Sequence, residues 1–329
     1  MLIKVHVLTS FSPVITLMAC APNKAKNIAR CLELAILMEA SAPKPGNVSV
    51  AANFDKTFFA HFLASGVAAS PSFESAAKRG IWLFQGRIDF SDLGVGRLIR
   101  NCINDINDWQ HGGNTLLGTV ILLLPIAVAS GMTPVIDLEI LRKNLKLIVE
   151  STTPRDAVNM YAAIKSANPG GLGKAPSLDV NDPDSVRRIF QGKVPLYKIF
   201  EIAQEYDTIC SEWVNNYPKT FDLAYPRLVR NMQTMGNVNG AVVQTFLEVL
   251  AKVPDTFIAR KTSIEKSREI SLKAEHIFNL GGAETLLGRK RLKEFDSELR
   301  KSSNLLNPGT TADIISAALA LYVLSGYRP

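Results

Sequence analysis

The chain has 329 residues, of which 47% are hydrophobic and 20% are charged, and its formal net charge is +7 at pH 7. This balance is typical of a globular protein with a large core, and it excludes an intrinsically disordered chain. The excess positive charge favours anionic partners such as polyphosphates, but aromatic residues are not interleaved with the basic ones, which argues against nucleic-acid binding.

The first 21 residues are apolar and contain a single lysine. Pro13 interrupts this run, and Met18 lies just before the organised sequence. A signal peptide would need a more basic start and an uninterrupted apolar region, so we expect an N-terminal strand or a start codon placed too early. We therefore expect a poorly defined segment over residues 1–23, of which residues 1–17 need not be native, followed by one helical domain over residues 24–329.

Apolar residues recur at helical spacing through most of the chain, as at Ile28, Leu32 and Ala35. Runs of alternating β-branched residues are scarce, so we predict an all-α fold made of a single large multi-helix domain. The predicted helices span residues 24–40, 58–69, 72–82, 93–109, 115–130, 137–150, 154–167, 194–215, 226–253, 264–280 and 311–324.

The most apolar stretch is residues 115–130, which carry no charge. It is shorter than the roughly 20 residues of a membrane span and contains Pro125, so we predict a buried core helix and no membrane association. The cysteines are far apart, and the histidines show no ligand spacing. We therefore expect reduced thiols in a cytoplasmic protein without a zinc site.

Five segments rich in Gly or Pro, with Asn, Thr or Asp, lead into predicted helices or lie between them. They are PKPGNV (43–48), HGGNTLLG (111–118), NPGGLGK (168–174), PDTFIARK (254–261) and NLLNPGTTADI (304–314). Helix capping alone explains the first three and the last, because Asn, Thr and Asp accept hydrogen bonds from free backbone N–H groups. An acidic turn residue beside solvated basic residues explains the fourth. However, exposed helix N-termini also bind anions, so several of them converging with Lys44 and Lys174 would form a polyphosphate pocket.

The third of these segments opens a long connection over residues 168–195, which we expect to be a loop facing the substrate. It is not a P-loop, because Asn168 and Ala175 stand where that motif requires Gly and Ser or Thr.

The five segments, in this order, resemble the motifs of the triphosphoribosyl-dephospho-coenzyme A synthase family over roughly residues 30–325. That family has a PKPG corner, an NT segment with a glycine, a PGG loop, a DTN segment with an arginine, and a terminal SPGGSAD helix start. Two features depart from the bacterial pattern. Leu116 and Leu117 replace a His and a Lys, and Asp55 is only a loose match to an acidic segment after PKPG. The chain is more similar to the archaeal branch, which leaves the acceptor open.

The resemblance implies a function for this chain and the residues of its site. Asp255 and Asp313 would be the catalytic and magnesium-binding residues. The sequence does not distinguish which of the two is the base and which binds the metal. The residues that would bind substrate or phosphate are Lys44, Gly46, Asn114, Thr115, Gly170, Gly171, Lys174, Arg260 and Asn304.

The implied reaction is the Mg²⁺-dependent transfer of a triphosphoribosyl group from ATP to 3′-dephospho-CoA, with release of adenine. Mg²⁺ would neutralise the triphosphate through hard oxygen ligands, and a carboxylate would take the acceptor's proton or stabilise an oxocarbenium-like ribose. The partners would be ATP and dephospho-CoA or a related small acceptor, and a homo-oligomer is compatible with the sequence. Two alternatives stay open. One is ATP glycohydrolysis or ribosyl transfer to another acceptor; the other is a nucleotide-binding helical scaffold without catalysis.

Overall fold

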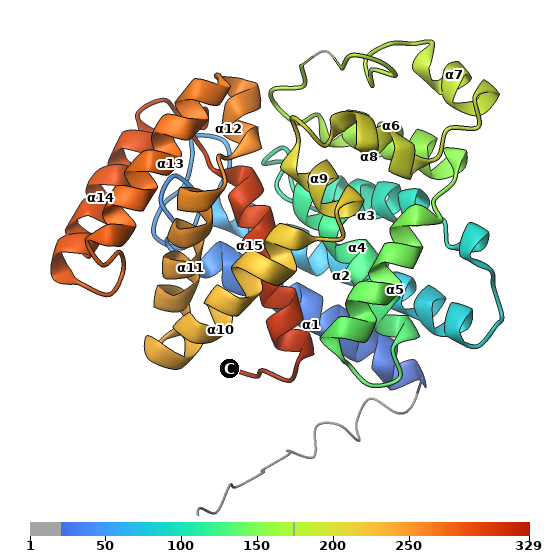
Figure 1. Ribbon diagram of the computed structural model, residues 1–329, viewed down its shortest axis with the longest axis horizontal. Coiled ribbons are helices and arrows are strands. Elements are labelled where there is room, and N and C mark those ends of the chain that lie inside the picture. Colours follow the sequence, from blue (N-terminus) through green and yellow to red (C-terminus); the bar gives the residue numbers. More distant parts are fainter. Residues whose placement is uncertain (1–20, 174) are drawn as a thin grey trace, which may run out of the picture.

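The computed structural model describes residues 21–173 and 175–329, and in these residues it forms helices and no strand (Figure 1). The all-α, single-domain fold expected from the sequence is therefore confirmed. The α-helices are α1 (Ala21–Ser41), α2 (Phe59–Phe84), α3 (Val95–Trp109), α4 (Leu117–Met132), α5 (Leu138–Glu150), α6 (Pro154–Ala167), α7 (Ser185–Gln191), α8 (Leu196–Ala203), α9 (Thr208–Val214), α10 (Tyr225–Thr234), α11 (Val238–Lys252), α12 (Thr256–Lys261), α13 (Ile264–Asn279), α14 (Leu286–Arg300) and α15 (Gly309–Leu324). A 3₁₀ turn (Phe90–Asp92) and a π-helical turn (Lys219–Ala224) complete the set.

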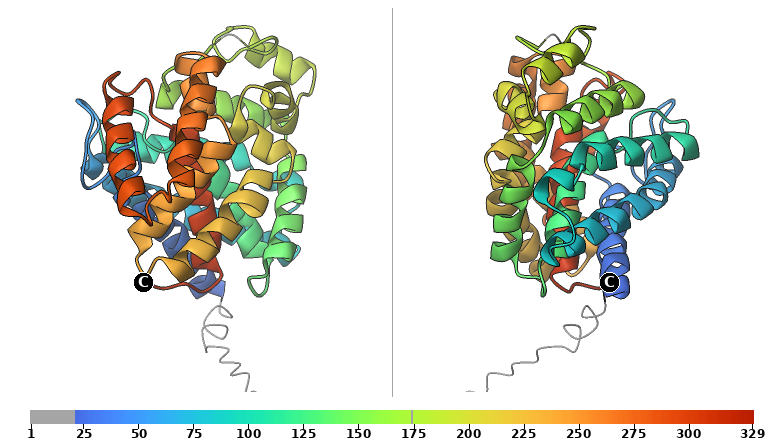
Figure 2. Two further views of the ribbon diagram at one scale, coloured as in Figure 1. Left: turned by 60° about the vertical axis from the view of Figure 1, so that its left-hand side comes forward. Right: turned by 90° about the vertical axis from the view of Figure 1, so that its right-hand side faces the viewer.

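Helices α4 and α15 form the centre of the molecule, and nearly all their side chains are buried. A helix that is apolar on all sides must lie in the interior, as expected for the charge-free stretch of α4. α15 runs through the middle of the bundle in all three views (Figures 1 and 2). Helices α1, α2, α10 and α11 pack around these two, and the buried side chains form one continuous core.

Three predicted boundaries were wrong. The helices predicted at 58–69 and 72–82 are one helix, α2, because Pro71 lies inside it without ending it. An internal proline removes one backbone hydrogen bond but need not stop a well-packed helix. The helix predicted at 194–215 is divided into α8 and α9, where the Asp207 side chain caps a new helix. The helix predicted at 226–253 is divided at Gly236, which has φ +65°.

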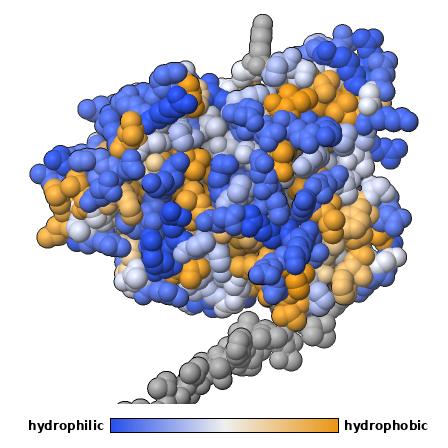
Figure 3. Space-filling model, viewed as in Figure 1, coloured by the Kyte–Doolittle hydropathy of each residue, from blue (hydrophilic) through white to orange (hydrophobic). Residues whose placement is uncertain are grey.

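The long loop after α6 is shorter than expected, because α7 forms within it. This loop and α6–α8 lie at one end of the molecule, at the upper right of Figure 1, while α13 and α14 form an outer hairpin on the left. The face shown in Figure 3 is mostly hydrophilic, with apolar patches scattered over it. None of the helices described has both the length and the hydropathy needed to cross a bilayer. The predicted segment 1–23 and its Met18 start lie almost entirely outside the described residues.

Candidate active site

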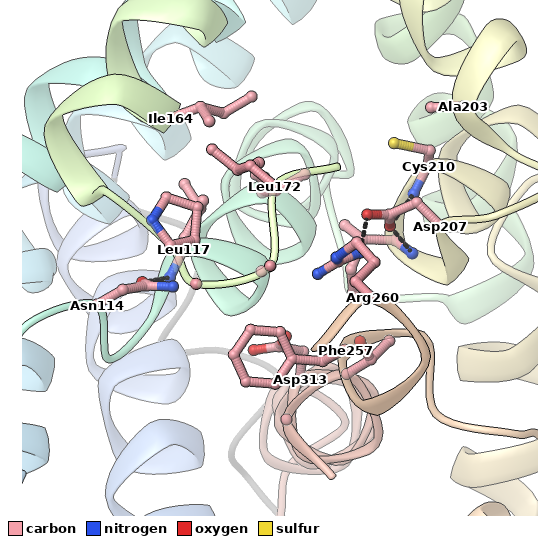
Figure 4. A pocket seen from close by; sticks show the side chains of 18 of the residues that line it. Asn114, Leu117, Ile164, Leu172, Ala203, Asp207, Cys210, Phe257, Arg260 and Asp313 are labelled. Atoms are coloured by element: carbon pink, nitrogen blue, oxygen red, sulfur yellow. Dashed lines mark hydrogen bonds and ion pairs between the residues drawn. The ribbon is translucent and has the colours of Figure 1, made fainter. Parts of the chain in front are cut away.

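A cavity of about 320 Å³ lies beside the beginnings of α4 and α15. The end of α1, the loop after α6 and side chains of α6, α8, α9 and α12 form the rest of its wall. Figure 4 shows side chains from segments far apart in the sequence facing this space. Asn114 and Asp313 lie on one side, and an apolar wall that includes Ile164, Leu172 and Ala203 lies on the other. The cavity therefore combines a polar end with a surface that suits an uncharged ring or chain.

Asp313, the fifth residue of α15, lies at the polar end of the cavity. Its Oδ1 accepts a hydrogen bond of 2.6 Å from the Thr119 hydroxyl at the start of α4. Burial raises the pKa of the Asp313 carboxyl to about 8; the Thr119 hydroxyl opposes this shift, and the charges of Glu39 and Asp255 add to it. A carboxyl group with such a pKa holds its proton near pH 7 and can donate it to a leaving group.

Glu39, at the end of α1, also lines the cavity, although it is not among the site residues predicted from the sequence. Its Oε1 lies 2.9 Å from the Nζ of Lys44, a fully buried ion pair. Its position on the helix could have identified it from the sequence, because Glu39 lies four residues after Ala35 and so on the apolar face of α1. An acidic side chain on a core-facing stripe needs a partner or a ligand.

The position of Lys44 does not support the predicted contact with phosphate. Its ammonium donates to the carbonyl oxygens of Glu39 and, over 3.0 Å, of Ala42, in addition to the ion pair. These partners use its three donors, and Lys44 does not line the cavity. The rigid corner between Pro43 and Pro45 thus places the lysine behind Glu39, where it compensates the buried carboxylate.

Gly46 has a structural place rather than the predicted place at the substrate. Its φ is +71°, and its N–H donates to Asp296 Oδ1 over 2.8 Å, which ties the corner to α14. A Cβ at this position would lie 2.8 Å from a methyl carbon of Leu299. Gly46 is absent from the lining of the cavity, so its role is a close backbone approach.

Asp255 does not line the cavity either, so its predicted catalytic and metal-binding roles are not supported by its position. One oxygen caps α12 by accepting from the N–H groups of Phe257 (2.9 Å) and Ile258 (3.1 Å). The other accepts from the backbone N–H (2.7 Å) and the hydroxyl (2.8 Å) of Thr311. Four donors occupy this buried carboxylate, which joins α12 to the start of α15.

Asn114 and Thr115 do lie on the cavity wall, as predicted. The Asn114 Oδ1 accepts from the N–H of Leu117 over 3.1 Å, and the Thr115 hydroxyl lies 2.7 Å from that of Ser65. The bond to Leu117 fixes the Asn114 amide just before α4, where its nitrogen has no hydrogen-bond partner among the described residues and can donate to a ligand.

The terminal motif contributes a different asparagine from the predicted one. Asn304 is exposed, and its carbonyl oxygen accepts from the Lys261 ammonium over 2.9 Å. Asn307 lines the cavity instead, and its Oδ1 is buried without a hydrogen-bond partner in the described part of the chain. It directly precedes the Pro-Gly pair, and this position in the motif was the signal that could have selected it.

Gly170, Gly171 and Arg260 line the cavity as predicted. Gly171 has φ +78°, and a Cβ there would lie 3.0 Å from Lys261 and 3.3 Å from the Arg260 backbone, so the loop lies directly on α12. Lys174 is outside the described residues.

The two leucines that depart from the bacterial motif, Leu116 and Leu117, are buried and line the cavity, whereas Asp55 is exposed and does not. The described cysteines are unpaired and buried: Cys31, Cys102 and Cys210. Cys20 lies outside the described residues.

Comparison with known proteins shows a consistent set of similarities. The family model described as ATP:dephospho-CoA triphosphoribosyl transferase matches residues 25–329. A relative from Pseudomonas savastanoi pv. phaseolicola, named "Probable 2-(5''-triphosphoribosyl)-3'-dephosphocoenzyme-A synthase", is 27% identical over 103 residues, which are 31% of this chain and 35% of the relative. A relative of the same name from Pseudomonas fluorescens (strain Pf0-1) is 25% identical over 129 residues, which are 39% of this chain and 44% of the relative. The aligned part thus spans only about a third of the length of the first relative.

A crystal structure from Archaeoglobus fulgidus, assigned as a triphosphoribosyl-dephospho-coA synthase, has a similar fold. The TM-score is 0.58 at 21% identity, over 81% of this chain and 100% of that one.

Proposed function

Because this chain belongs to the ATP:dephospho-CoA triphosphoribosyl transferase family, we propose that it transfers a triphosphoribosyl group from ATP to a ribose hydroxyl of 3′-dephospho-CoA and releases adenine. One observation carries the proposal: all five predicted segments bring residues to the same cavity. The first segment contributes Asn47 and Val48, and the other four contribute the predicted site residues Asn114, Thr115, Gly170, Gly171, Arg260 and Asp313. A set of helix caps without a shared ligand would have no reason to converge in this way.

In the proposed step, the acceptor oxygen forms a bond to C1′ of the ATP ribose while the bond between C1′ and adenine N9 breaks. The bonding electrons leave with adenine, so a proton donor lowers the barrier. Asp313 suits this role, because its Oδ1 is bound to Thr119 and its Oδ2 can carry the proton. The carboxylate that remains takes up the proton that the acceptor hydroxyl loses, and the proton balance closes.

The charge of the wall favours a metal that enters with the nucleotide. Besides the protonated Asp313, three carboxyl groups line the described cavity (Glu39, Asp179 and Asp207), and Arg260 is the only basic side chain among its described lining residues. A triphosphate would be repelled there unless cations accompanied it.

The residues of the cavity suit a Mg²⁺ ion that is held mainly by the nucleotide. No group of three or more His, Cys, Asp or Glu in residues 21–173 and 175–329 is arranged as a metal site. Mg²⁺ commonly uses only one or two carboxylates together with substrate phosphates and water. Glu39 fits this pattern, because its Oε2 has no partner among the described residues, whereas both oxygens of Asp255 are occupied. When bound, Mg²⁺ would neutralise the triphosphate.

The test is to incubate the protein with ATP and Mg²⁺, with and without dephospho-CoA, and to measure free adenine by chromatography and the product by mass. Adenine that appears only with the acceptor supports the proposal, and chelation of Mg²⁺ should abolish it. Asp313→Asn should lower the rate about 100-fold or more, as expected for loss of an acid catalyst. Asp184→Asn is the matched control, because Asp184 is exposed and pairs with Arg187.

Other outcomes select the alternatives. Adenine release without any acceptor would indicate ATP glycohydrolysis, and release only with a different acceptor would indicate another ribosyl transfer. The uncharged Leu117 in place of a lysine on the cavity wall is the observation that keeps a changed acceptor open. Nucleotide binding without adenine release would indicate a scaffold.

A further inference from the structure

Asp207 and Arg260 form an ion pair on the cavity wall, although 53 positions separate them in the sequence. The Arg260 Nη1 donates to Asp207 Oδ2 (Figure 4). The other oxygen of Asp207 accepts from the backbone N–H groups of Ile209 (2.8 Å) and Cys210 (3.3 Å) and so caps α9. One oxygen therefore fixes the carboxylate to the scaffold, while the other holds the guanidinium.

Arg260 is fixed by a second contact and still has donors to spare. Its Cζ lies 5.7 Å from the centre of the Phe257 ring, which is within the range of a cation–π interaction. Among the described residues, its Nε and Nη2 have no hydrogen-bond partner, and Figure 4 shows guanidinium nitrogens directed into the cavity. An anion in the cavity would meet this half-free, planar group.

We propose that Asp207 is a positioning residue that holds the Arg260 guanidinium in the orientation that binds the phosphate groups of the nucleotide. This inference rests on the proposed function, in which the substrate is ATP. A free arginine side chain has many rotamers, and ordering it on binding costs affinity. A guanidinium that is already held by one corner loses less freedom when its remaining donors meet a phosphate.

The negative charge of Asp207 acts in the opposite direction, because it repels phosphate. Both side chains of the pair are about one-fifth exposed, so solvent screens this repulsion. Only one of the guanidinium nitrogens is engaged, so the phosphate need not displace Asp207 to bind. We therefore expect the ordering effect to exceed the repulsion.

The chain offers a substitution that separates positioning from helix capping. Asn caps helices about as well as Asp, so Asp207→Asn keeps the cap of α9 and removes the charge that holds Arg260. The matched control is Asp137→Asn, which makes the same exchange at the cap of α5, where Asp137 Oδ1 accepts from Ile140 over 2.9 Å. Asp137 does not line the cavity.

The experiment measures the binding of ATP with Mg²⁺ by isothermal titration calorimetry, for the wild type, Asp207→Asn, Arg260→Ala and the double variant. Asp207→Asn should weaken binding about three- to tenfold, a size typical of coupled neighbouring residues. It should have no further effect when Arg260 is already absent. In steady-state assays, the KM for ATP should rise while kcat changes little.

Two results would overturn the inference. One is unchanged or tighter ATP binding by Asp207→Asn; the other is an equal loss of affinity in the Arg260→Ala background, which would indicate a purely structural role. The proposed function fails separately, because it depends on adenine release and not on this coupling. A protein that binds ATP with the expected coupling but releases no adenine would retain the positioning role alone. A wild type that binds no ATP would overturn both.

Discussion

Gly118 and Asp313 are in direct contact across the interface between α4 and α15. A Cβ added to Gly118 would lie only 2.0 Å from Asp313 Oδ2 and 2.6 Å from its Cγ. Gly118 is in the first turn of α4, so its backbone is helical and does not require glycine. The absence of a side chain is what leaves room for the carboxyl group. Two motifs separated by most of the sequence are thus complementary in shape.

Gly118→Ala should therefore displace the Asp313 carboxyl group and lower the rate of adenine release by about 100-fold or more. Overpacking of this kind costs about 1–3 kcal/mol of unfolding free energy, although alanine otherwise favours a helix over glycine. Urea unfolding and the adenine assay measure the two effects. In the double variant with Asp313→Ala, the clash disappears, and stability should recover beyond the sum of the single changes. Simple additivity would show that the contact is not the cause.

The titration of Asp313 should make the protein less stable as the pH rises. Burial raises its pKa to about 8 in the folded protein, whereas an unfolded aspartate has a pKa of about 3.9. Between these values the folded state holds a proton that the unfolded state has lost, so the free energy of unfolding falls by up to about 1.4 kcal/mol per pH unit. The stabilisation is complete below about pH 4 and is lost by about pH 8.

Asp313→Asn should remove this pH dependence, because the amide resembles the protonated acid in shape and does not titrate. Urea unfolding at pH 5, 7 and 9 measures the effect. The free energy of unfolding of the variant should increase relative to that of the wild type as the pH rises toward 9. Parallel stability curves for the two proteins would mean that Asp313 is already ionised in the folded state.

Lys44→Met should destabilise the protein by about 3–5 kcal/mol, because it leaves the Glu39 carboxylate buried without its counter-charge. The double variant with Glu39→Gln should recover much of this loss, since no unpaired charge then remains. Denaturant unfolding of the wild type, of Lys44→Met and Glu39→Gln alone and of the double variant tests the pair. A raised KM for ATP at unchanged stability would instead restore the phosphate-binding role that the sequence predicted for Lys44.

Asp255→Ala should lower stability by about 2–4 kcal/mol, because it removes a helix cap and leaves the N–H and hydroxyl of Thr311 without their acceptor. The specific activity of the folded fraction should stay close to that of the wild type. Thermal unfolding and the adenine assay on the same preparation separate the two. Complete loss of activity in a protein with unchanged unfolding would return Asp255 to the catalytic residues.

Local patterns predicted much of the fold and part of the site. The spacing of apolar residues predicted most of the helices. The charge-free stretch at 115–130 predicted a buried helix, and this helix, α4, lies at the centre of the molecule. The recurring loops before helix starts, together with the family resemblance, also selected Asn114 and Asp313, which both line the cavity. These features could be predicted because a helix period and a helix start each depend on neighbouring residues.

The partner of each polar side chain was decided only by tertiary structure. Asp255 and Asp313 occupy similar positions near helix starts, yet one is enclosed by four donors and the other faces the cavity. Lys44 forms an ion pair with Glu39. Asp207 caps α9 at a position where the apolar spacing predicted the middle of one continuous helix. A buried charge must be compensated by a polar or charged group, and the packing of helices distant in the sequence decides which group lies beside it. The residues next to the charge in the sequence therefore do not predict its partner.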